Sequence, residues 1–390
     1  MAEELIMVRE KIRILHLIKS LGRGGAEMLL PETLKHHQHE KFEFHYIYFL
    51  PWKNQMVESL EQAGGKVTCM QANNTIQILL KVFTLIKYCR KHKINLIHCH
   101  LPWAGIVGRL VFKLIHTPLI YTEHNKQERY HRITRFVNRL TFNWQSAIIA
   151  VSEDVTESIA RNIRPSVPVR NIVNGVNTDF FQRDSKSGRA LRTQLGIPEE
   201  AIVVGTVAVF RVQKRLDVWL NVFKSASERD IRLYGILVGD GPLRKELEQL
   251  RKNFGLEHRV FMPGLQSDVR PWYSAMDIFM MTSLFEGLPV ALLEAMSMQC
   301  AVLTTDAGGV KEVVRNEKDG LMVPVENWID LTEKIDSLVN HERFRRDLGE
   351  TARKRVINKF SINRMVTELE KLYSEVYKIH ANLGSSAIAQ

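Results

Sequence analysis

Short apolar runs alternate with longer amphipathic segments along the chain of 390 residues, and the alternation restarts once near the middle. The run 12–18 is typical of a buried strand, the glycines within 22–25 of a turn, and the segment from Ala26 onward of a helix. Strands that alternate with helices form parallel sheets with helices on both faces. We therefore expect an α/β fold of two Rossmann-like, doubly wound parallel-sheet domains that face each other across a cleft.

The expected elements divide the chain into three parts. The polar, turn-rich segment 178–200 is interpreted as the passage between the domains. We predict an N-terminal domain at 1–175, a C-terminal domain at 176–360, and a helix at 361–380 that packs back on the first domain. Further strands are expected at 42–50, 94–100, 118–125, 147–153, 169–175, 201–210, 234–241, 260–264, 277–283 and 300–306, and helices at 77–93, 215–226 and 242–254.

The composition is typical of a folded protein without a membrane anchor. Hydrophobic residues make up 45% and charged residues 25% of the chain. No apolar run approaches the roughly 20 residues that a membrane-spanning helix needs. The N-terminus carries acidic residues where a secretion signal would carry basic ones. We expect a cytoplasmic protein. Its four cysteines lack the spacing of a metal site and are interpreted as free thiols.

The positive charge is concentrated in the first part of the chain. Residues 1–175 contain 24 Lys and Arg against 14 Asp and Glu, whereas the remainder contains 30 against 29. Such an excess attracts an acidic ligand or surface, although a solvated basic face would give the same count. Peripheral association with the inner face of a membrane through this half is therefore left open. No nucleic-acid partner is expected, because no recognition module accompanies the charge.

Two glutamates bracket an apolar helix in the second half. In LFEGLPVALLEAM, residues 284–296, Glu286 precedes the predicted helix start near Leu288, and Glu294 lies eight residues further on. The start of a helix presents unpaired N–H groups and the positive end of the helix dipole, which attract phosphate. Eight residues span about 12 Å, a length comparable to that of a nucleotide sugar. The segment therefore favours a diphosphate site with a carboxylate toward each end of the ligand.

Three segments together resemble one enzyme family. They are GRGGAE at 22–27, the segment from Met262 to Met296, and TTDAGGVKEVV at 304–314, in this order. With them the chain resembles the family 4 retaining glycosyltransferases, which have the GT-B fold and are also grouped as glycosyl transferases group 1. The resemblance covers nearly the whole chain. It implies that the first domain lies on the acceptor side and that the second binds the nucleotide sugar.

The resemblance implies roles for residues of the second domain. Glu286 would bind hexose hydroxyls and Glu294 the ribose, while Lys214 and Arg211 would meet the charge of the departing diphosphate. Gly239 would lie near the nucleotide base. The helix start would contribute Gly287, Leu288, Pro289 and Val290 to substrate binding. Many relatives have arginine where this chain has Val209, and glycine and proline where it has Gln299 and Ala301.

For the first domain the resemblance implies a second set of residues. His124 would act near the reacting sugar as a catalytic residue. Gly24 and Gly25 would allow the backbone to approach phosphate or acceptor closely. His100 would line the acceptor side, and Asn174 would border the cleft beside the passage between the domains.

Together these features predict a retaining hexosyltransferase. It would move a hexose from a nucleoside diphosphate sugar to a hydroxyl of a saccharide or lipid-linked acceptor, in the synthesis of a cell-envelope polysaccharide, lipopolysaccharide or glycolipid. Two alternatives stay open: a sugar-nucleotide epimerase of the same fold, and a non-catalytic nucleotide-sugar binding protein. The chain has no Asp-x-Asp motif to hold a divalent ion, so we expect no metal and no other cofactor.

Overall fold

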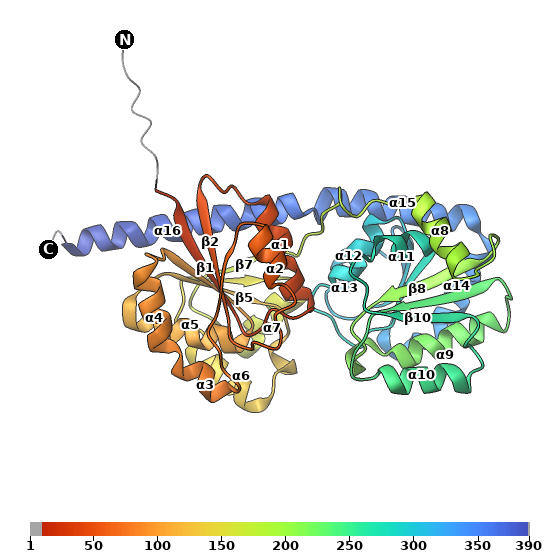
Figure 1. Ribbon diagram of the computed structural model, residues 1–390, viewed down its shortest axis with the longest axis horizontal. Coiled ribbons are helices and arrows are strands. Elements are labelled where there is room, and N and C mark those ends of the chain that lie inside the picture. Colours follow the sequence, from red (N-terminus) through yellow and green to blue (C-terminus); the bar gives the residue numbers. More distant parts are fainter. Residues whose placement is uncertain (1–9, 389–390) are drawn as a thin grey trace, which may run out of the picture. The chain divides into compact units, whose positions relative to one another are not determined.

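The chain forms two compact α/β units. The computed structural model describes residues 10–388, with side chains described up to residue 382. Unit 1 comprises the chain up to Val173 together with the segment from Met365 onward, and unit 2 comprises Asn174–Arg364. Figure 1 labels the elements of both units. Among the described residues, no helix is both long enough and apolar enough to cross a membrane.

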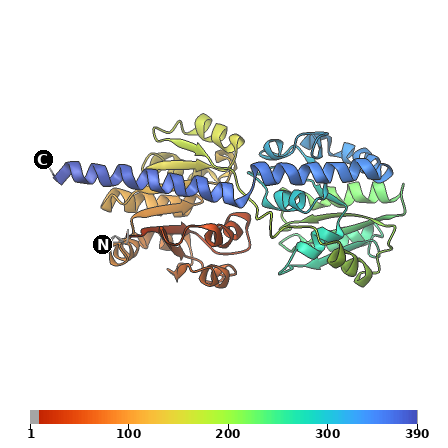
Figure 2. The same cartoon turned by 90° about the horizontal axis from the view of Figure 1, so that it is seen from above.

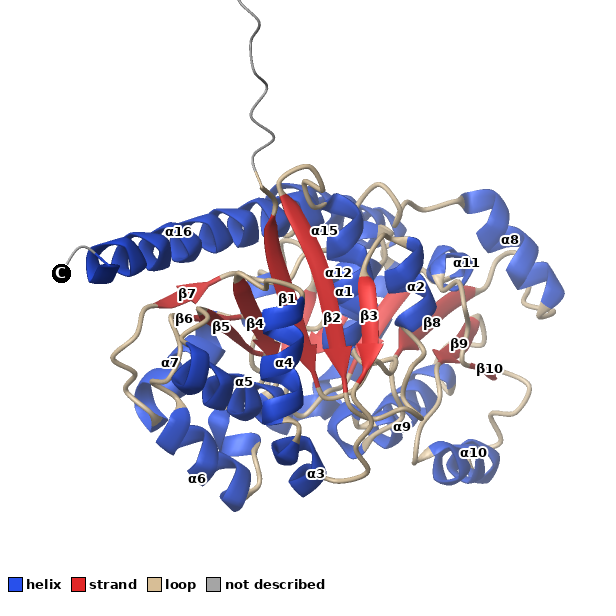
Figure 3. Cartoon of the chain, turned by 60° about the vertical axis from the view of Figure 1, so that its left-hand side comes forward, coloured by secondary structure: helices blue, strands red, loops and turns tan. Residues whose placement is uncertain are grey.

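Unit 1 is built on a parallel sheet of seven strands. Their order is β3-β2-β1-β4-β5-β6-β7, and every neighbouring pair is parallel. Figure 3 shows these strands side by side with helices on both faces. The strands are β1 Ile12–Ile18, β2 Phe42–Tyr48, β3 Lys66–Cys69, β4 Leu96–His100, β5 Leu119–Glu123, β6 Ala147–Ala150 and β7 Val169–Asn171.

The helices of unit 1 connect successive strands. Helix α5 packs against α3, α4 and α6, so these four share one side of the unit. The helices are α1 Gly25–His36, α2 Val57–Gln62, α3 Thr75–Leu80, α4 Val82–Lys91, α5 Pro102–Ile115, α6 Arg132–Thr141 and α7 Glu153–Asn162, with a 3₁₀ turn at Gln127–Arg129.

The last helix, α16 (Ile362–Ile388), belongs largely to unit 1. Its apolar side chains join the core formed by β1, β2, α1 and α2. Those side chains are Met365, Leu369, Leu372, Tyr373 and Val376. Figure 2 shows this part of α16, in blue, running across unit 1. The amphipathic spacing of the segment therefore serves burial against a sheet that lies about 200 residues or more earlier in the chain.

Unit 2 repeats the same strand order with six parallel strands, β10-β9-β8-β11-β12-β13. Both sheets thus have the Rossmann order 3-2-1-4-5-6, in which ligands bind beyond the carboxyl ends of the strands. The predicted fold class of two Rossmann-like parallel-sheet domains is confirmed. The strands are β8 Ile202–Val207, β9 Leu233–Val238, β10 Val260–Gly264, β11 Ile278–Met281, β12 Ala301–Thr305 and β13 Leu321–Val323.

The helices of unit 2 cover this sheet around a core that includes Trp219, Phe223 and Leu338. They are α8 Ser185–Gln194, α9 Leu216–Ser227, α10 Arg244–Asn253, α11 Arg270–Ala275, α12 Val290–Ser297, α13 Val310–Val313, α14 Leu331–Asn340 and α15 Glu342–Lys359, with 3₁₀ turns at Val212–Lys214 and Val325–Asp330.

The segment interpreted as the passage between the domains contains a helix. Helix α8 is capped by Asp184, whose side chain accepts a hydrogen bond from the Lys186 N–H. It packs against α11 at Gly188, where an added Cβ would lie 2.5 Å from the carbonyl oxygen of Ser274. The segment interpreted as a polar, turn-rich passage thus includes a helix, and close packing at Gly188 holds this helix in place.

Candidate functional site

In unit 2, the loop between β11 and α12 is fixed by hydroxyl groups at strand ends. The Thr282 hydroxyl lies 3.1 Å from the carbonyl oxygen of Lys214 and 2.9 Å from that of Arg215. The Thr305 hydroxyl, at the end of β12, donates to the carbonyl oxygen of Ser283 at 2.7 Å. Both threonines are buried. These bonds hold the 3₁₀ turn after β8 and the loop after β11 against each other.

Lys214 and Glu286 form an ion pair on this framework. The Lys214 Nζ lies 2.5 Å from the Glu286 Oε1, and the Ser283 hydroxyl donates to the same oxygen at 2.6 Å. The Gln213 amide donates to the carbonyl oxygen of Phe285 at 2.8 Å. Glu286 is 7% exposed, whereas the Lys214 side chain is 22% exposed. A buried carboxylate needs such partners, and the lysine keeps an open side for a ligand.

Helix α12 begins directly after this pair. Pro289 is its N-cap residue, and no side chain caps the helix. Within residues 10–388, the N–H groups of Val290 and Ala291 donate to no acceptor, and both residues are partly exposed. The unpaired amides and the helix dipole make this end a site for an anion. The helix starts two residues later than the predicted Leu288 because Pro289, which lacks an N–H, stands at the cap.

Asn174 holds the segment before α12 from the other side. Its side-chain amide donates to the carbonyl oxygen of Leu288 at 3.2 Å. The residue is 4% exposed, and its Oδ1 is buried without a hydrogen-bond partner in the described part of the chain. An unsatisfied buried acceptor is costly unless a ligand or water donates to it. The geometry thus places an unused acceptor beside the open helix terminus.

Glu294 lies inside α12 and is bound by a tyrosine. The Tyr273 hydroxyl donates to the Glu294 Oε2 at 2.8 Å and lies 3.2 Å from the carbonyl oxygen of Ala291. Burial, reinforced by the negative charge of Glu294, holds the pKa of Tyr273 well above its usual value, so the phenol stays a donor. Glu294 is itself 6% exposed. Its carboxylate is therefore fixed in orientation.

Arg211 and Gly239 flank the turn that carries Lys214. Arg211 is exposed and makes no contact with an acid within the described residues. Gly239 follows β9 at a φ of +129°, and an added Cβ would lie 1.9 Å from the carbonyl oxygen of Ala208. The Phe210 N–H donates to the carbonyl oxygen of Asp240 at 2.9 Å. Only glycine allows the loop after β9 to approach the loop after β8 this closely.

In unit 1, the two predicted site histidines contact each other. His100 ends β4 and His124 follows β5, and the His100 Nδ1 lies 3.3 Å from the His124 Nε2. His16, in β1, extends this row of contacting histidines, with its Nδ1 2.9 Å from the His100 Nε2. His98 instead binds the hydroxyls of Tyr373 and Thr122, each at 2.7 Å. The sheet register places these side chains together because β1, β4 and β5 are neighbours.

These imidazoles are held neutral. Burial lowers the pKa of His98 to about 3 and that of His124 to about 4, and it lowers the pKa values of His16 and His100 as well. Neutral imidazole both donates and accepts hydrogen bonds. In the described chain, His16, His98 and His100 also form a group whose ligand atoms lie within 4.8 Å of one another, a spacing compatible with a metal ion.

Gly24 and Gly25 stand at the start of α1. Gly24 is its N-cap residue, without a side-chain cap bond, and Gly25 is exposed with open space around its Cα. A Cβ on Gly24 would meet the carboxylate of Glu27 at 2.3 Å. The backbone is thus accessible here, on the carboxyl side of β1.

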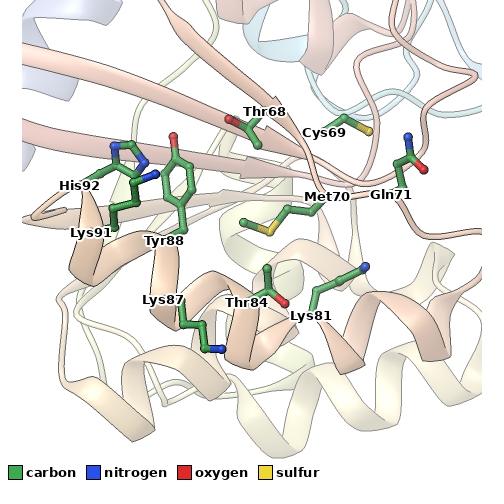
Figure 4. Close-up of a pocket in the computed structure, with 10 residues that line it drawn as sticks. All are labelled: Thr68, Cys69, Met70, Gln71, Lys81, Thr84, Lys87, Tyr88, Lys91 and His92. Atoms are coloured by element: carbon green, nitrogen blue, oxygen red, sulfur yellow. The ribbon is translucent and has the colours of Figure 1, made fainter.

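Unit 1 also contains a groove between β3 and α4, drawn in Figure 4. Its volume is about 610 Å³. Residues that follow or end β3 line one side and α4 lines the other, so that the lysines lie on the helical side. None of the predicted site residues lines it. The lining residues are Thr68, Cys69, Met70, Gln71, Lys81, Thr84, Lys87, Tyr88, Lys91 and His92.

The predicted residues thus fall into two groups, one in each unit. In unit 2, Lys214, Glu286 and Asn174 meet around the start of α12, together with Gly287, Leu288, Pro289 and Val290. The sequence did not single out Ser283, Gln213, Tyr273 and His16. Ser283 had a signal, because it is a polar residue at the end of a predicted strand, whereas Tyr273 lies in an apolar stretch without one.

Two family models match the chain, one for each unit. The model described as Glycosyltransferase Family 4 matches residues 23–180, and the model described as Glycosyl transferases group 1 matches residues 188–355. Together they cover most of the chain.

Curated relatives have related names. An N-acetyl-alpha-D-glucosaminyl L-malate synthase of Bacillus anthracis is 27% identical over 63% of each chain. A UDP-Gal:alpha-D-GlcNAc-diphosphoundecaprenol alpha-1,3-galactosyltransferase of Escherichia coli is 24% identical over 77% of this chain and 80% of its own. A Campylobacter jejuni alpha-1,4-N-acetyl-D-galactosaminyltransferase, named for an undecaprenol-linked acceptor, is 25% identical over 94% and 99%.

A solved structure has the same fold. Anabaena HepE in complex with UDP-glucose superposes with a TM-score of 0.83 at 22% identity, over 93% of this chain and 99% of its own. On the two family matches and this shared architecture, the chain belongs to the family 4 glycosyltransferases, with a GT-B fold.

Proposed function

We propose that the chain is a retaining hexosyltransferase that takes its sugar from a nucleoside diphosphate donor without the help of a metal ion. The single observation that carries this proposal is the Lys214–Glu286 pair at the uncapped start of α12. A cation, two unpaired amides and a carboxylate are the groups that a sugar diphosphate needs. The diphosphate would meet Lys214 and the amides of Val290 and Ala291.

Each remaining group has a place in this scheme. Glu286 would accept hydrogen bonds from hexose hydroxyls, and Glu294, held by Tyr273, from the ribose. Arg211 would add charge to the departing diphosphate, and Gly239 would border the nucleotide base. Asn174, whose Oδ1 is unsatisfied, would accept a hydrogen bond from the ligand. None of these side chains is an obvious covalent nucleophile, so their contribution is orientation and charge stabilisation.

Unit 1 would supply the acceptor side. His124 would contact the reacting sugar, with His100 behind it, and the accessible glycines Gly24 and Gly25 would admit the acceptor or the donor phosphates. Two relatives are named for undecaprenol-linked acceptors, which supports a lipid-linked saccharide and a role in polysaccharide or glycolipid synthesis. The structures with UDP and UDP-glucose support a nucleotide-sugar donor.

The proposal is tested by incubating the protein with a panel of nucleotide sugars. We expect one donor to raise the thermal midpoint and to be hydrolysed slowly, with release of the nucleoside diphosphate and a sugar of unchanged anomeric configuration. Interconversion of the sugar within the intact nucleotide would indicate an epimerase, and binding without turnover of any donor and acceptor pair would indicate a binding protein. Either result would overturn the proposal.

Metal independence is tested separately. We expect transfer to proceed in the presence of EDTA, because Lys214, Arg211 and the helix terminus would meet the charge on the diphosphate. Complete loss of transfer on chelation, restored by Mg²⁺, would contradict this part.

A further inference from the structure

Helix α6 exposes its apolar residues to solvent, whereas an ordinary surface helix buries them. Ile133, Phe136 and Leu140 are 63%, 63% and 61% exposed. The side turned inward is polar instead, with Asn138 and Thr141 buried. A surface helix of a folded protein normally buries its apolar stripe and exposes its polar one. In α6 this arrangement is reversed.

The inward side of α6 is occupied by a buried arginine. The Arg109 guanidinium, from α5, donates to Asn138 Oδ1 at 2.6 Å and to Thr141 Oγ1 at 3.2 Å. The Asn138 amide in turn donates to Gln127 at 3.0 Å. These bonds fix which side of α6 faces the unit. The hydrogen-bond network therefore keeps the apolar residues of α6 exposed.

A stripe of arginines runs beside the apolar residues. Arg132, Arg135 and Arg139 are exposed, and none of them forms an ion pair within the described residues. At 100° per residue, the arginines and the apolar residues together cover an arc of about 160°, with the two kinds on adjacent halves. Helix α6 contains no acidic residue.

Helices α3 and α4 repeat the combination. Ile76, Leu80 and Phe83 are 70%, 71% and 72% exposed and follow one another at helical spacing. Lys87 and Lys91, one and two turns further along the same stripe, are exposed as well. Both α3 and α6 pack against α5, and Figures 1 and 3 both show them at the same end of unit 1.

We propose that unit 1 docks on an anionic membrane surface through the exposed side of α6, with the α3–α4 stripe as a second contact. An apolar stripe beside a row of unpaired basic residues is the pattern of a helix that lies in the bilayer interface, with its side chains among the headgroups and upper acyl chains. Anionic phospholipid headgroups complement the arginines. A second copy of this chain would not, because the same face would bring three more arginines and no carboxylate.

Docking on a membrane deepens the proposed function. The reason for docking rests on that function, whereas the docking itself does not. A lipid-linked acceptor has its reacting saccharide at the membrane surface. Helix α6 begins eight residues after His124, so a short loop joins the proposed docking helix to the residue predicted to act near the reacting sugar. Binding to the membrane can be measured without donor, acceptor or turnover.

The test is sedimentation of the full chain with vesicles. The vesicles are phosphatidylcholine alone or phosphatidylcholine with about one-third phosphatidylglycerol, at moderate salt. We expect binding to the anionic vesicles only. Replacing the apolar set by Ile133→Ser, Phe136→Ser and Leu140→Ser, or the arginines by Arg132→Gln, Arg135→Gln and Arg139→Gln, should each weaken that binding on the order of a hundredfold.

Matched controls come from unit 2. Ile231, Leu265 and Ile329 are exposed apolar residues, and Arg189, Arg343 and Arg346 are exposed arginines. The same substitutions at these sites should leave vesicle binding unchanged. The donor should raise the thermal midpoint of the α6 variants as much as that of the unchanged protein. An equal shift shows that the variants fold and that their donor site is intact.

Three results would overturn the proposal. The first is absence of binding of the unchanged protein to anionic vesicles. The second is equal binding of the α6 variants and the unit 2 controls. The third is a dimer, measured by light scattering without vesicles, that the apolar α6 variant converts to a monomer, because a second copy would then occupy this face.

Discussion

The two units have the same strand order but use their strand ends in opposite electrostatic ways. Unit 2 gathers charge, with Lys214 and Glu286 paired at a helix terminus. Unit 1 gathers neutral groups, with His16, His98 and His100 buried on neighbouring strands and His124 just beyond the end of β5. Both sets lie toward the carboxyl ends of parallel strands, where such sheets place their ligand sites. The shared topology thus fixes where a site lies, and the side chains decide whether it meets charge or hydroxyl groups.

The largest expected effect concerns the charged group. Lys214→Met should lower kcat/KM on the order of 10²–10³-fold, because the departing diphosphate loses its nearest cation. Steady-state transfer with the donor found in the panel measures this. Lys245→Met, at an exposed lysine of α10, is the matched control. A Lys214 variant with the activity of the control would remove the charged group from the proposed mechanism.

The second prediction concerns the stability of the two units in acid. His16, His37, His98, His100 and His124 all have pKa values lowered mainly by burial. Their neutral forms stabilise the fold fully above pH 6.5, and this contribution is lost as the pH falls toward about 4 and then 3. The loss is about 3 kcal/mol for His124 alone and about 5 kcal/mol for His98 alone. Glu123 opposes this trend, because burial raises its pKa, but burial also lowers the pKa values of His45 and His380, so it is one group against seven.

Hydrogen exchange resolved by unit measures this difference. Unit 2 contains only His258 and His341, both exposed. Between pH 7 and pH 4.5, after correction for intrinsic rates, amides in the core of unit 1 should lose protection before those of unit 2. If amides of unit 2 lost protection first, the proposed contrast between the neutral histidines of unit 1 and the charged Lys214–Glu286 pair of unit 2 would be contradicted.

A smaller effect is expected from the tyrosine that orients the second glutamate. Tyr273→Phe removes the hydrogen bond to Glu294 and leaves the packing nearly unchanged. The donor KM should rise about tenfold with little change in kcat, because a bond to a charged acceptor is lost in the ground state and the transition state alike. An equal fall in kcat with unchanged KM would instead place Glu294 at the reacting sugar.

The smallest prediction tests backbone geometry outside the site. Gln299 follows α12 with a φ of +59°, in the left-handed region that favours glycine. Gln299→Gly should raise the free energy of unfolding by about 1 kcal/mol. Transfer should be unaffected, and chemical denaturation measures the gain. A loss of stability would mean that the glutamine side chain makes a compensating contact.

The sequence predicted the strands well but extended several of them too far. The segments 42–50 and 118–125 were expected as strands, whereas β2 ends at Tyr48 and β5 at Glu123. Phe49 and Leu50, beyond the end of β2, are buried and apolar, so the apolar composition continues after the hydrogen bonds between the strands have stopped. The chain leaves the sheet there to form loops, and His124 lies in one of them.

The partners of the site residues were beyond the reach of the sequence. Lys214 and Glu286 could each be singled out by motif, but their ion pair joins residues 72 positions apart. His16 and Tyr273 lie in apolar segments that read as core, and only the packed sheet brings them to His100 and Glu294. The reversed face of α6 was likewise hidden, because periodicity reveals an apolar stripe and not which way it points.

The central claim is that the amino end of α12, with Lys214 and Glu286, binds the diphosphate of a nucleotide sugar. The most direct measurement is a crystal structure of the protein with the donor selected by the panel. The proposed mechanism predicts diphosphate oxygens within hydrogen-bond distance of the Val290 and Ala291 amides and of the Lys214 Nζ. A donor whose diphosphate lies elsewhere, with this helix terminus unoccupied, would contradict it.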